Sequence, residues 1–154
     1  MDTLNIINKI FEPAHAVSLT NVLIILSMAA VGIGETVYLI KKRLAVEPPI
    51  CVIGYECRKV LESEYSSILG VHNDTLGLAF YITVTTLTML LALGINPKNI
   101  IDLLLEIVIV SGTITSAVLL YLQWRVIRAW CFWCVISATT VFVMLTVIIF
   151  GDLI

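Results

Sequence analysis

Charged side chains are scarce in this sequence of 154 residues. Lysine, arginine, aspartate and glutamate together make up 13% of it, whereas hydrophobic residues make up 60% and the mean hydropathy is +1.05. A soluble domain needs a more polar surface than this composition supplies. The 9 lysines and arginines are also too few for the dense basic patch that nucleic-acid binding requires, so no nucleic-acid partner is expected. The composition therefore favours a protein of the lipid bilayer.

A basic N-terminal region, of the kind that begins a cleavable signal peptide, is missing as well. The first eighteen residues carry Asp2, Lys9 and Glu12 and the polar break Pro13-Ala14-His15. We therefore expect the first apolar segment to remain attached as a membrane anchor.

Four apolar stretches have the length of a membrane-spanning helix, which takes about 20 residues. They cover residues 19–40, 76–93, 101–122 and 130–149. Short connections make the last three helices antiparallel neighbours, and a helical bundle satisfies their backbone groups in lipid. The sequence predicts an all-α integral membrane protein, a single membrane domain over 1–154 built as a four-transmembrane-helix bundle.

The connection 41–75 is long enough to need a structure of its own. Between Cys57 and Leu69, apolar residues recur near helical spacing among charged ones, and Gly70 follows where a helix would end. We expect a short amphipathic helix here, lying over the mouth of the bundle.

Cys131 and Cys134 form the motif C-F-W-C at the predicted start of the fourth helix. A spacing of three places both sulfur atoms on one side of a helix. The positive end of the helix dipole lowers a thiol pKa at this position and raises the fraction of reactive thiolate. The pair is typical of a redox-active C-x-x-C site.

Cys51 and Cys57 lie in the long connection, which the four-helix topology places on the same membrane face as Cys131 and Cys134. Pro48-Pro49 and Gly54 loosen this segment, which favours exchange between the two pairs through mixed disulfides. Other interpretations are small buried hydrophobes, two inert disulfides or a structural zinc site. The five-residue gap between Cys51 and Cys57 is unusual for zinc, so no metal is expected.

Together these residues resemble the vitamin K epoxide reductase family. The shared pattern consists of the loop pair Cys51 and Cys57, a serine six residues later (Ser63), the motif Gly77-x-x-x-Tyr81 entering the second helix, and the C-x-x-C motif. The match covers most of the chain, from the first helix to the fourth.

The resemblance implies a membrane thiol:quinone oxidoreductase that generates disulfides. In such an enzyme Cys134 is the thiol that reduces the quinone, and Cys131 is its partner that exchanges with Cys57. Cys51 then meets a thioredoxin-fold protein, expected to be separate because this sequence carries no fused thioredoxin domain. A non-enzymatic membrane module with structural cysteines remains an alternative, as does a quinone-linked reductase running in the opposite direction.

The expected cofactor is a lipid-soluble quinone such as ubiquinone or menaquinone. Ser63 resembles the family serine near the quinone head group, and Asn73 resembles the asparagine that hydrogen-bonds a quinone oxygen in the animal enzymes. An exposed hydroxyl and a helix N-cap are their respective structural alternatives. Trp133 has two interpretations, an interfacial anchor and a wall of the quinone pocket. Ala138 stands where the animal enzymes have a tyrosine, which favours quinone reduction over epoxide reduction.

Glu35 is an acid within the first apolar stretch, and such a residue is a functional candidate by default. It lies about two turns from Lys41-Lys42, so we favour a position near the membrane interface over a role in proton uptake.

The basic residues are distributed unequally between the two predicted faces. Seven of the nine fall on the cysteine-bearing side, namely Lys41, Lys42, Arg43, Arg58, Lys59, Arg125 and Arg128, against Lys9 and Lys98 on the other. Basic residues in short loops are retained in the cytoplasm. We therefore expect a multi-pass protein of the cell membrane whose cysteines face the cytoplasm, an inverted topology for this family.

Overall fold

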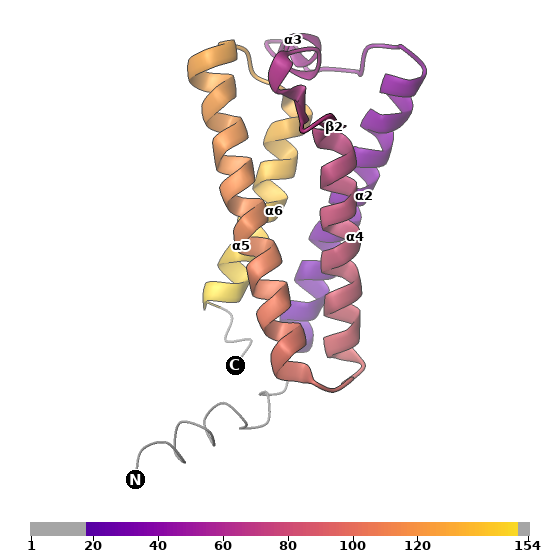
Figure 1. Ribbon diagram of the computed structural model, residues 1–154, viewed down its shortest axis with the longest axis vertical. Helices are drawn as coiled ribbons and strands as arrows, with labels where there is room; N and C mark the ends of the chain where they lie inside the picture. The colour runs from indigo at the N-terminus through magenta and orange to yellow at the C-terminus, as the bar shows by residue number, and fades with distance from the viewer. Residues whose placement is uncertain (1–17, 151–154) are drawn as a thin grey trace.

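The structure, a computed structural model, describes residues 18–150 (Figure 1). Lys9 and the N-terminal segment that was expected to lack signal-peptide character lie outside the described residues. Four long helices dominate: α2 (Leu19–Leu44), α4 (Asn73–Ala92), α5 (Lys98–Leu122) and α6 (Phe132–Phe150). Each is long and apolar enough to cross a membrane. The prediction of four long apolar helices suited to span a membrane is confirmed.

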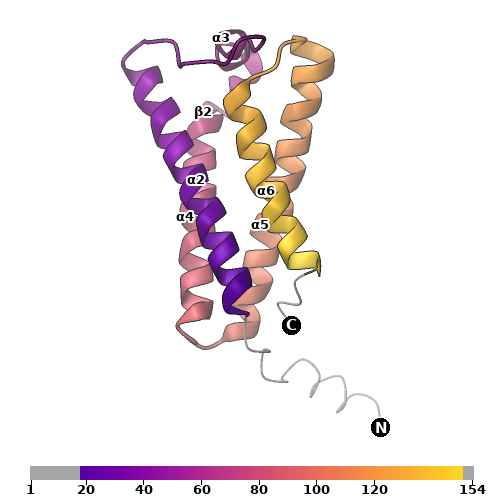
Figure 2. The same cartoon turned by 180° about the vertical axis from the view of Figure 1, so that it is seen from behind.

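The helices form a ring in which α2 packs against α4 and α6, and α5 packs against the same two helices. The connections before α4 and α6 both lie at one end of the bundle, and the connection between α4 and α5 lies at the other (Figure 1). Figure 2 shows the segment after α2 running across the cysteine-bearing end toward α3 (Cys57–Leu61). This arrangement brings residues of the long connection over the start of α6.

Small residues let α2 and α4 approach closely. A side chain at Gly32 would overlap the ring of Tyr81, and a Cβ atom at Gly77 would lie 3.1 Å from the methyl carbon of Thr36. Close helix packing of this kind replaces the hydrophobic driving force that lipid does not supply. The motif Gly77-x-x-x-Tyr81 therefore has a packing role at the α2–α4 contact.

Tyr81 also connects α4 to α6 through its hydroxyl group. The ring is buried, and its oxygen lies 2.8 Å from Ser137 Oγ and 2.7 Å from Thr140 Oγ1. Buried hydroxyl groups are stable only when they are hydrogen-bonded. The tyrosine thus fixes the spacing of three helices below the cysteine end.

The predicted helix bounds need correction at several ends. The first helix continues through the basic cluster to Leu44, since cations in a last turn are stabilised by the helix dipole. The second helix begins at Asn73 and the third at Lys98, each three residues before its predicted start. A turn of π-helix, Gln123–Ile127, extends α5, and Arg128 follows in the left-handed conformation with φ of 51°.

The amphipathic helix predicted for 57–69 is not confirmed. A helix covers Cys57–Leu61 alone, followed by the short 3-10 turn Glu64–Ser66 and a two-stranded hairpin, β1 (Ser67–Ile68) with β2 (Val71–His72). The Ser63 hydroxyl donates a 2.6 Å hydrogen bond to the carbonyl oxygen of Val60, which caps the helix early. The turn residues Leu69 and Gly70 have φ of 52° and 83°, which closes a hairpin instead of continuing a helix.

Candidate redox site

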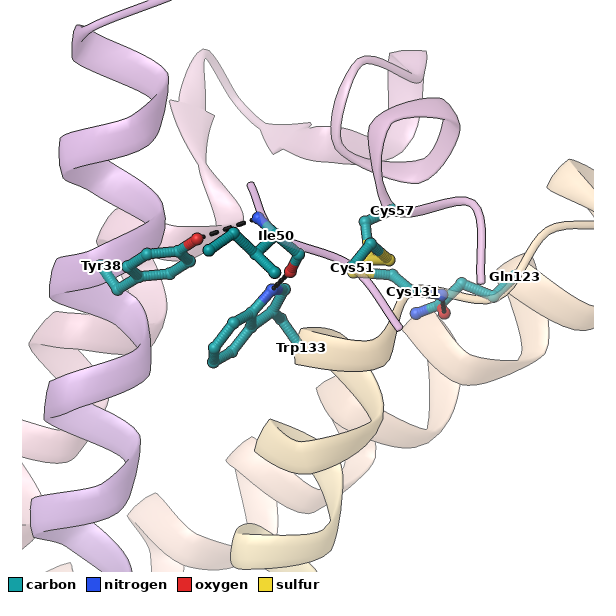
Figure 3. Close-up of a disulfide and its surroundings, with 7 residues drawn as sticks. All are labelled: Tyr38, Ile50, Cys51, Cys57, Gln123, Cys131 and Trp133. Carbon is teal, nitrogen blue, oxygen red and sulfur yellow. Dashed lines mark hydrogen bonds between the residues drawn. A yellow bond between two sulfur atoms is a disulfide. The ribbon is translucent and has the colours of Figure 1, made fainter. Parts of the chain in front are cut away.

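All four cysteines gather at one end of the bundle, as predicted. Cys51 and Cys57 form a disulfide with a Cα–Cα distance of 6.1 Å, whereas Cys131 and Cys134 are free thiols. Cys57 is 2% exposed and Cys131 0% exposed, and they belong to one buried cluster with Val60 and Ala129. Figure 3 shows the loop disulfide beside Cys131. The structure therefore places one cysteine of each pair against the other.

Two aromatic side chains hold the backbone that carries Cys51. The Ile50 N–H donates a 2.9 Å hydrogen bond to the hydroxyl of Tyr38, and the Trp133 indole N–H donates a 2.8 Å hydrogen bond to the carbonyl oxygen of Ile50 (Figure 3). The two rings lie 4.7 Å apart between centroids. We call Tyr38 and Trp133 the aromatic clamp. It fixes the residue next to Cys51 from both α2 and α6.

The backbone beside Cys57 is also held by the segment that enters α6. The N–H of Glu56, next to Cys57, donates a 2.9 Å hydrogen bond to the carbonyl oxygen of Trp130, next to Cys131. Cys51 and Cys57 are therefore both positioned by the residues that enter α6. The sequence predicted a loosened segment here, but it did not reveal these tethers.

The helix α6 begins at Phe132, two residues later than predicted, so Cys131 lies immediately before it. Its carbonyl oxygen accepts a 3.1 Å hydrogen bond from the N–H of Val135, so Cys131 occupies the N-cap position. Its own N–H donates a 3.0 Å hydrogen bond to Gln123 Oε1. Gln123 is buried and was missed in the sequence analysis, although an amide at the end of a long apolar stretch is an unusual residue.

The N-cap position also affects the chemistry of the Cys131 thiol. A hydrogen bond from the Cys134 thiol, followed by backbone N–H groups of Cys134 and Trp133, lowers the pKa of Cys131, and burial opposes this only in part. Thiolate is the nucleophilic form of cysteine. A lowered pKa also makes the Cys131 sulfur a better leaving group when a disulfide that contains it is broken.

A cavity of about 330 Å³ lies between the helices below the cysteine-bearing loop. Its lining includes all four residues expected to contact a quinone: Ser63, Asn73, Trp133 and Cys134. Cys131 is not among the lining residues. The two thiols of the C-x-x-C motif therefore have different surroundings, because Cys131 lies against Cys57 and Cys134 lines the cavity.

The cavity fits the head group of a quinone. Pockets for small ligands occupy about 300–1,000 Å³ and combine apolar walls with a few polar groups. Here Leu119, Leu120 and Ala138 supply apolar wall. Asn73 Oδ1 is buried without a hydrogen-bond partner in the described part of the chain, while its Nδ2 group donates to the carbonyl oxygen of Tyr65 at 2.8 Å. An unpaired buried acceptor of this kind is available for a ligand hydroxyl.

Two of the structural alternatives are settled by these positions. His72 is the N-cap residue of α4, so Asn73 lies inside the helix and does not cap it. Ser63 is half-buried beside the cavity and is not a freely exposed hydroxyl. Glu35 is buried at 5% exposure and also lines the cavity, and its expected position near the membrane interface stays a prediction.

The chain matches the model of the Vitamin K epoxide reductase family over residues 23–149. It belongs to this family. The match runs from the first turns of α2 to the end of α6 and includes all four cysteines. Among curated proteins, none matches the chain.

Family membership and the four apolar helices make the chain a multi-pass membrane protein with thiol–disulfide oxidoreductase chemistry, in a family that is linked to quinones in general. The Cys51–Cys57 disulfide is consistent with this chemistry. Ala138 is buried and lines the cavity without a hydroxyl group.

Proposed function

We propose that this protein oxidises the thiols of a separate thioredoxin-fold partner and transfers two electrons to a lipid-soluble quinone. The proposal is carried by the different surroundings of the two C-x-x-C thiols. Cys131 contacts the cluster that contains Cys57, whereas Cys134 lines the cavity. An electron relay needs one sulfur facing the donor pair and one facing the acceptor.

The first exchange takes place at the loop disulfide. Cys51 is half-exposed and Cys57 is buried, so an external thiolate reaches Cys51 first. Its attack forms a mixed disulfide with Cys51 and releases Cys57 as a thiolate. A second thiol of the partner then displaces Cys51, which leaves the partner oxidised and the loop pair reduced.

The second exchange moves the disulfide inward. The Cys57 thiolate attacks Cys131 of the oxidised C-x-x-C pair, and Cys134 leaves as a thiolate. Cys51 then attacks Cys57, which restores the loop disulfide and leaves Cys131 and Cys134 reduced. The structure has this combination of an oxidised loop pair and a reduced C-x-x-C pair.

The quinone, when bound, accepts two electrons and two protons from the reduced pair. In this proposal Cys134 delivers the electrons, and its position among the residues that line the cavity supports that role. Trp133 and Ser63 line the cavity, where Trp133 supplies a flat apolar wall, and Asn73 Oδ1 can accept a hydrogen bond from a hydroxyl group of the quinol product. Substrate orientation is the main contribution these residues can make.

The activity is tested with purified protein in lipid, a reduced thioredoxin-fold protein and a short-chain ubiquinone or menaquinone. We expect quinone reduction coupled to partner oxidation in the wild-type protein and none in Cys134→Ala. Retained activity in this variant would reject the relay. Reduction of an oxidised partner by quinol, without the forward reaction, would reverse the direction of electron flow. Cysteines that neither exchange nor become alkylated after mild reduction would indicate a structural role.

We also propose that the cysteine end faces the cytoplasm. All of the described lysines and arginines except Lys98 lie at this end, and Lys41, Lys42 and Arg43 occupy the last turn of α2, where the positive-inside rule acts strongly. A cysteine-free background provides a clean test. In it, Ile53→Cys places a thiol at a position that is 100% exposed in the loop, and Leu93→Cys places one at the opposite end, at 70% exposure.

Intact cells are treated with a membrane-impermeant maleimide before and after permeabilisation. The proposal expects the thiol at position 93 to react in intact cells and the thiol at position 53 to react only after permeabilisation. The reverse pattern would place the cysteines outside. Because the two variants report on opposite ends of one bundle, each serves as the control for the other.

A further inference from the structure

Glu35 is a buried acid that the relay described above does not use. It lies nine residues before the last residue of α2, about 14 Å along the helix axis from that end. The residue is 5% exposed, and neither carboxylate oxygen has a hydrogen-bond partner in the described part of the chain. A buried carboxylate without such partners is costly and is therefore rarely only structural.

The surroundings of Glu35 connect it to the reacting thiols. It lines the same cavity as Cys134, so the carboxyl group and that thiol face one enclosed space. The hydroxyl groups of Tyr81 and Ser137 are its polar neighbours, and these two groups lie 2.8 Å from each other. Tyr81 comes from α4 and Ser137 from α6, so the acid lies where three helices meet below the C-x-x-C motif.

The other ionisable groups that line the cavity lie closer to its loop side, and most are paired. Lys42 bonds to Glu47 at 2.7 Å, Arg43 to Asp74 at 2.8 Å, and Arg58 to Glu62 at 2.9 Å. Glu35 is seven residues deeper along α2 than Lys42, which is about 10 Å. Among the carboxyl groups that line the cavity, Glu35 is the one in the interior of α2, on the side of the cavity away from the loop.

The chemistry of the pair requires a proton acceptor at this depth. Oxidation of Cys131 and Cys134 breaks two S–H bonds, forms one S–S bond and releases two electrons and two protons. Reduction of a quinone takes up two electrons and two protons, so the reaction balances without another reactant. Cys134 is a free thiol, and its proton must leave before both sulfur atoms can join.

We propose that Glu35 accepts the proton of Cys134 as electrons leave the C-x-x-C pair and returns that proton to the quinone in the cavity. The proton of Cys131 leaves to water at the loop side, and the quinone takes its second proton from water at the cavity mouth. The acid is protonated once and deprotonated once in each turnover, so it ends in its starting state. This inference rests on the proposed quinone reductase function. Glu35 would carry a proton between the Cys134 thiol and the quinone, which share one cavity.

The test compares Glu35→Gln, Glu35→Asp and a matched control, Glu106→Gln. Glu106 is a half-buried acid on α5 that does not line the cavity. We expect Glu35→Gln to lower the rate of quinone reduction by on the order of 100-fold, the range of a lost proton-transfer group. Glu35→Asp should restore part of the rate, and Glu106→Gln should match the wild-type protein.

Two further measurements distinguish proton transfer from a change in packing. Exchange between Cys57 and Cys131 in the absence of quinone should be unchanged within about threefold in Glu35→Gln, because no proton need pass through the cavity. Quinone reduction by this variant should become proportional to hydroxide concentration, whereas the wild-type rate should vary less over the same pH range. The ionisable groups that face Glu35 from the packed helices are Tyr81 and Cys134, and Cys131 lies just before α6. None of these residues is changed in the variants that are compared.

Infrared difference spectra supply a readout that does not depend on turnover. Oxidation of the C-x-x-C pair by added oxidant should change a carboxyl band that is absent from Glu35→Gln and present in Glu106→Gln. Wild-type rates in Glu35→Gln, or an equal fall in exchange and quinone reduction, would overturn the role of Glu35 while leaving the quinone reductase function standing. A wild-type protein that reduces no quinone in a Cys134-dependent manner would overturn both.

Discussion

The indole nitrogen of Trp133 donates a 2.8 Å hydrogen bond to the carbonyl oxygen of Ile50, the residue immediately before Cys51 (Figure 3). Trp133 is itself the third residue of the C-F-W-C motif. The motif therefore positions the loop pair as well as supplying its own two thiols. A displacement of the loop and a displacement of the start of α6 are mechanically linked through this bond.

Trp133→Phe should slow thiol exchange between Cys57 and Cys131. The substitution keeps an aromatic wall at the cavity but removes the N–H donor that holds Ile50. A hydrogen bond of this kind contributes about 1 kcal/mol, so we expect a fall of about fivefold in the exchange rate. The rate is measured by acid quenching at timed intervals and mapping of disulfides by mass spectrometry without reduction.

Tyr38→Phe is the control for the clamp. It removes the hydroxyl that accepts the Ile50 N–H, and Tyr38 does not line the cavity. A similar fall in exchange in both variants would assign the effect to the position of Ile50. A fall in Trp133→Phe alone, accompanied by a higher KM for quinone, would instead assign it to the cavity wall.

Cys134→Ser should trap a disulfide between Cys57 and Cys131. In the relay, Cys134 is the group that Cys57 displaces, and without it the Cys131 sulfur can form a stable bond with its buried neighbour. The species is detected by mass mapping under non-reducing conditions after mild oxidation. A disulfide between Cys51 and Cys131 instead would show that the two loop cysteines have the opposite roles.

The membrane fold could be predicted because its signals are local in the sequence. Four apolar stretches of helical length specify four spans, and the positions of the connections bring the cysteine pairs to one end. The ends of the helices differ from the predicted ones by two to four residues at several positions. The first apolar stretch ends at residue 40, before Lys41, Lys42 and Arg43, yet these residues remain helical because a last turn accommodates basic side chains.

The finer structure of the site depends on contacts between distant residues, which the sequence does not display. The bonds from Tyr38 and Trp133 to Ile50 join residues of α2, the loop and α6. The pattern over 57–69 resembled an amphipathic helix, but Ser63 and the left-handed Leu69 redirect the chain into a hairpin. Charge and hydropathy patterns contain no information on such hydrogen bonds.

Gly32→Ala should destabilise the bundle, whereas Gly34→Ala should not. An added methyl group at Gly32 overlaps the ring of Tyr81, while nothing lies within 4 Å of one at Gly34. Overpacking of a buried contact costs about 1–3 kcal/mol. Replacing glycine by alanine inside a helix contributes about 0.5–1 kcal/mol in the favourable direction when no clash occurs.

Thermal unfolding in the same detergent measures both glycine variants. We expect a lower midpoint for Gly32→Ala and an equal or higher one for Gly34→Ala. Loss of quinone reduction in Gly32→Ala should accompany the loss of stability, because Tyr81 would be moved from Ser137 and Thr140. Equal midpoints in the two variants would show that α2 and α4 can separate without cost.

Gln123→Met should weaken both the stability of the site and its exchange chemistry. The amide oxygen of Gln123 accepts a 3.0 Å hydrogen bond from the N–H of Cys131, and both residues are buried. Methionine has a similar length but leaves this N–H without a strong acceptor, which costs about 1–3 kcal/mol. We expect a lower unfolding midpoint and slower exchange between Cys57 and Cys131. Trp124→Leu, at the exposed neighbouring position, should change neither property, and a Gln123→Met protein that matches it would show that Cys131 is held by α6 alone.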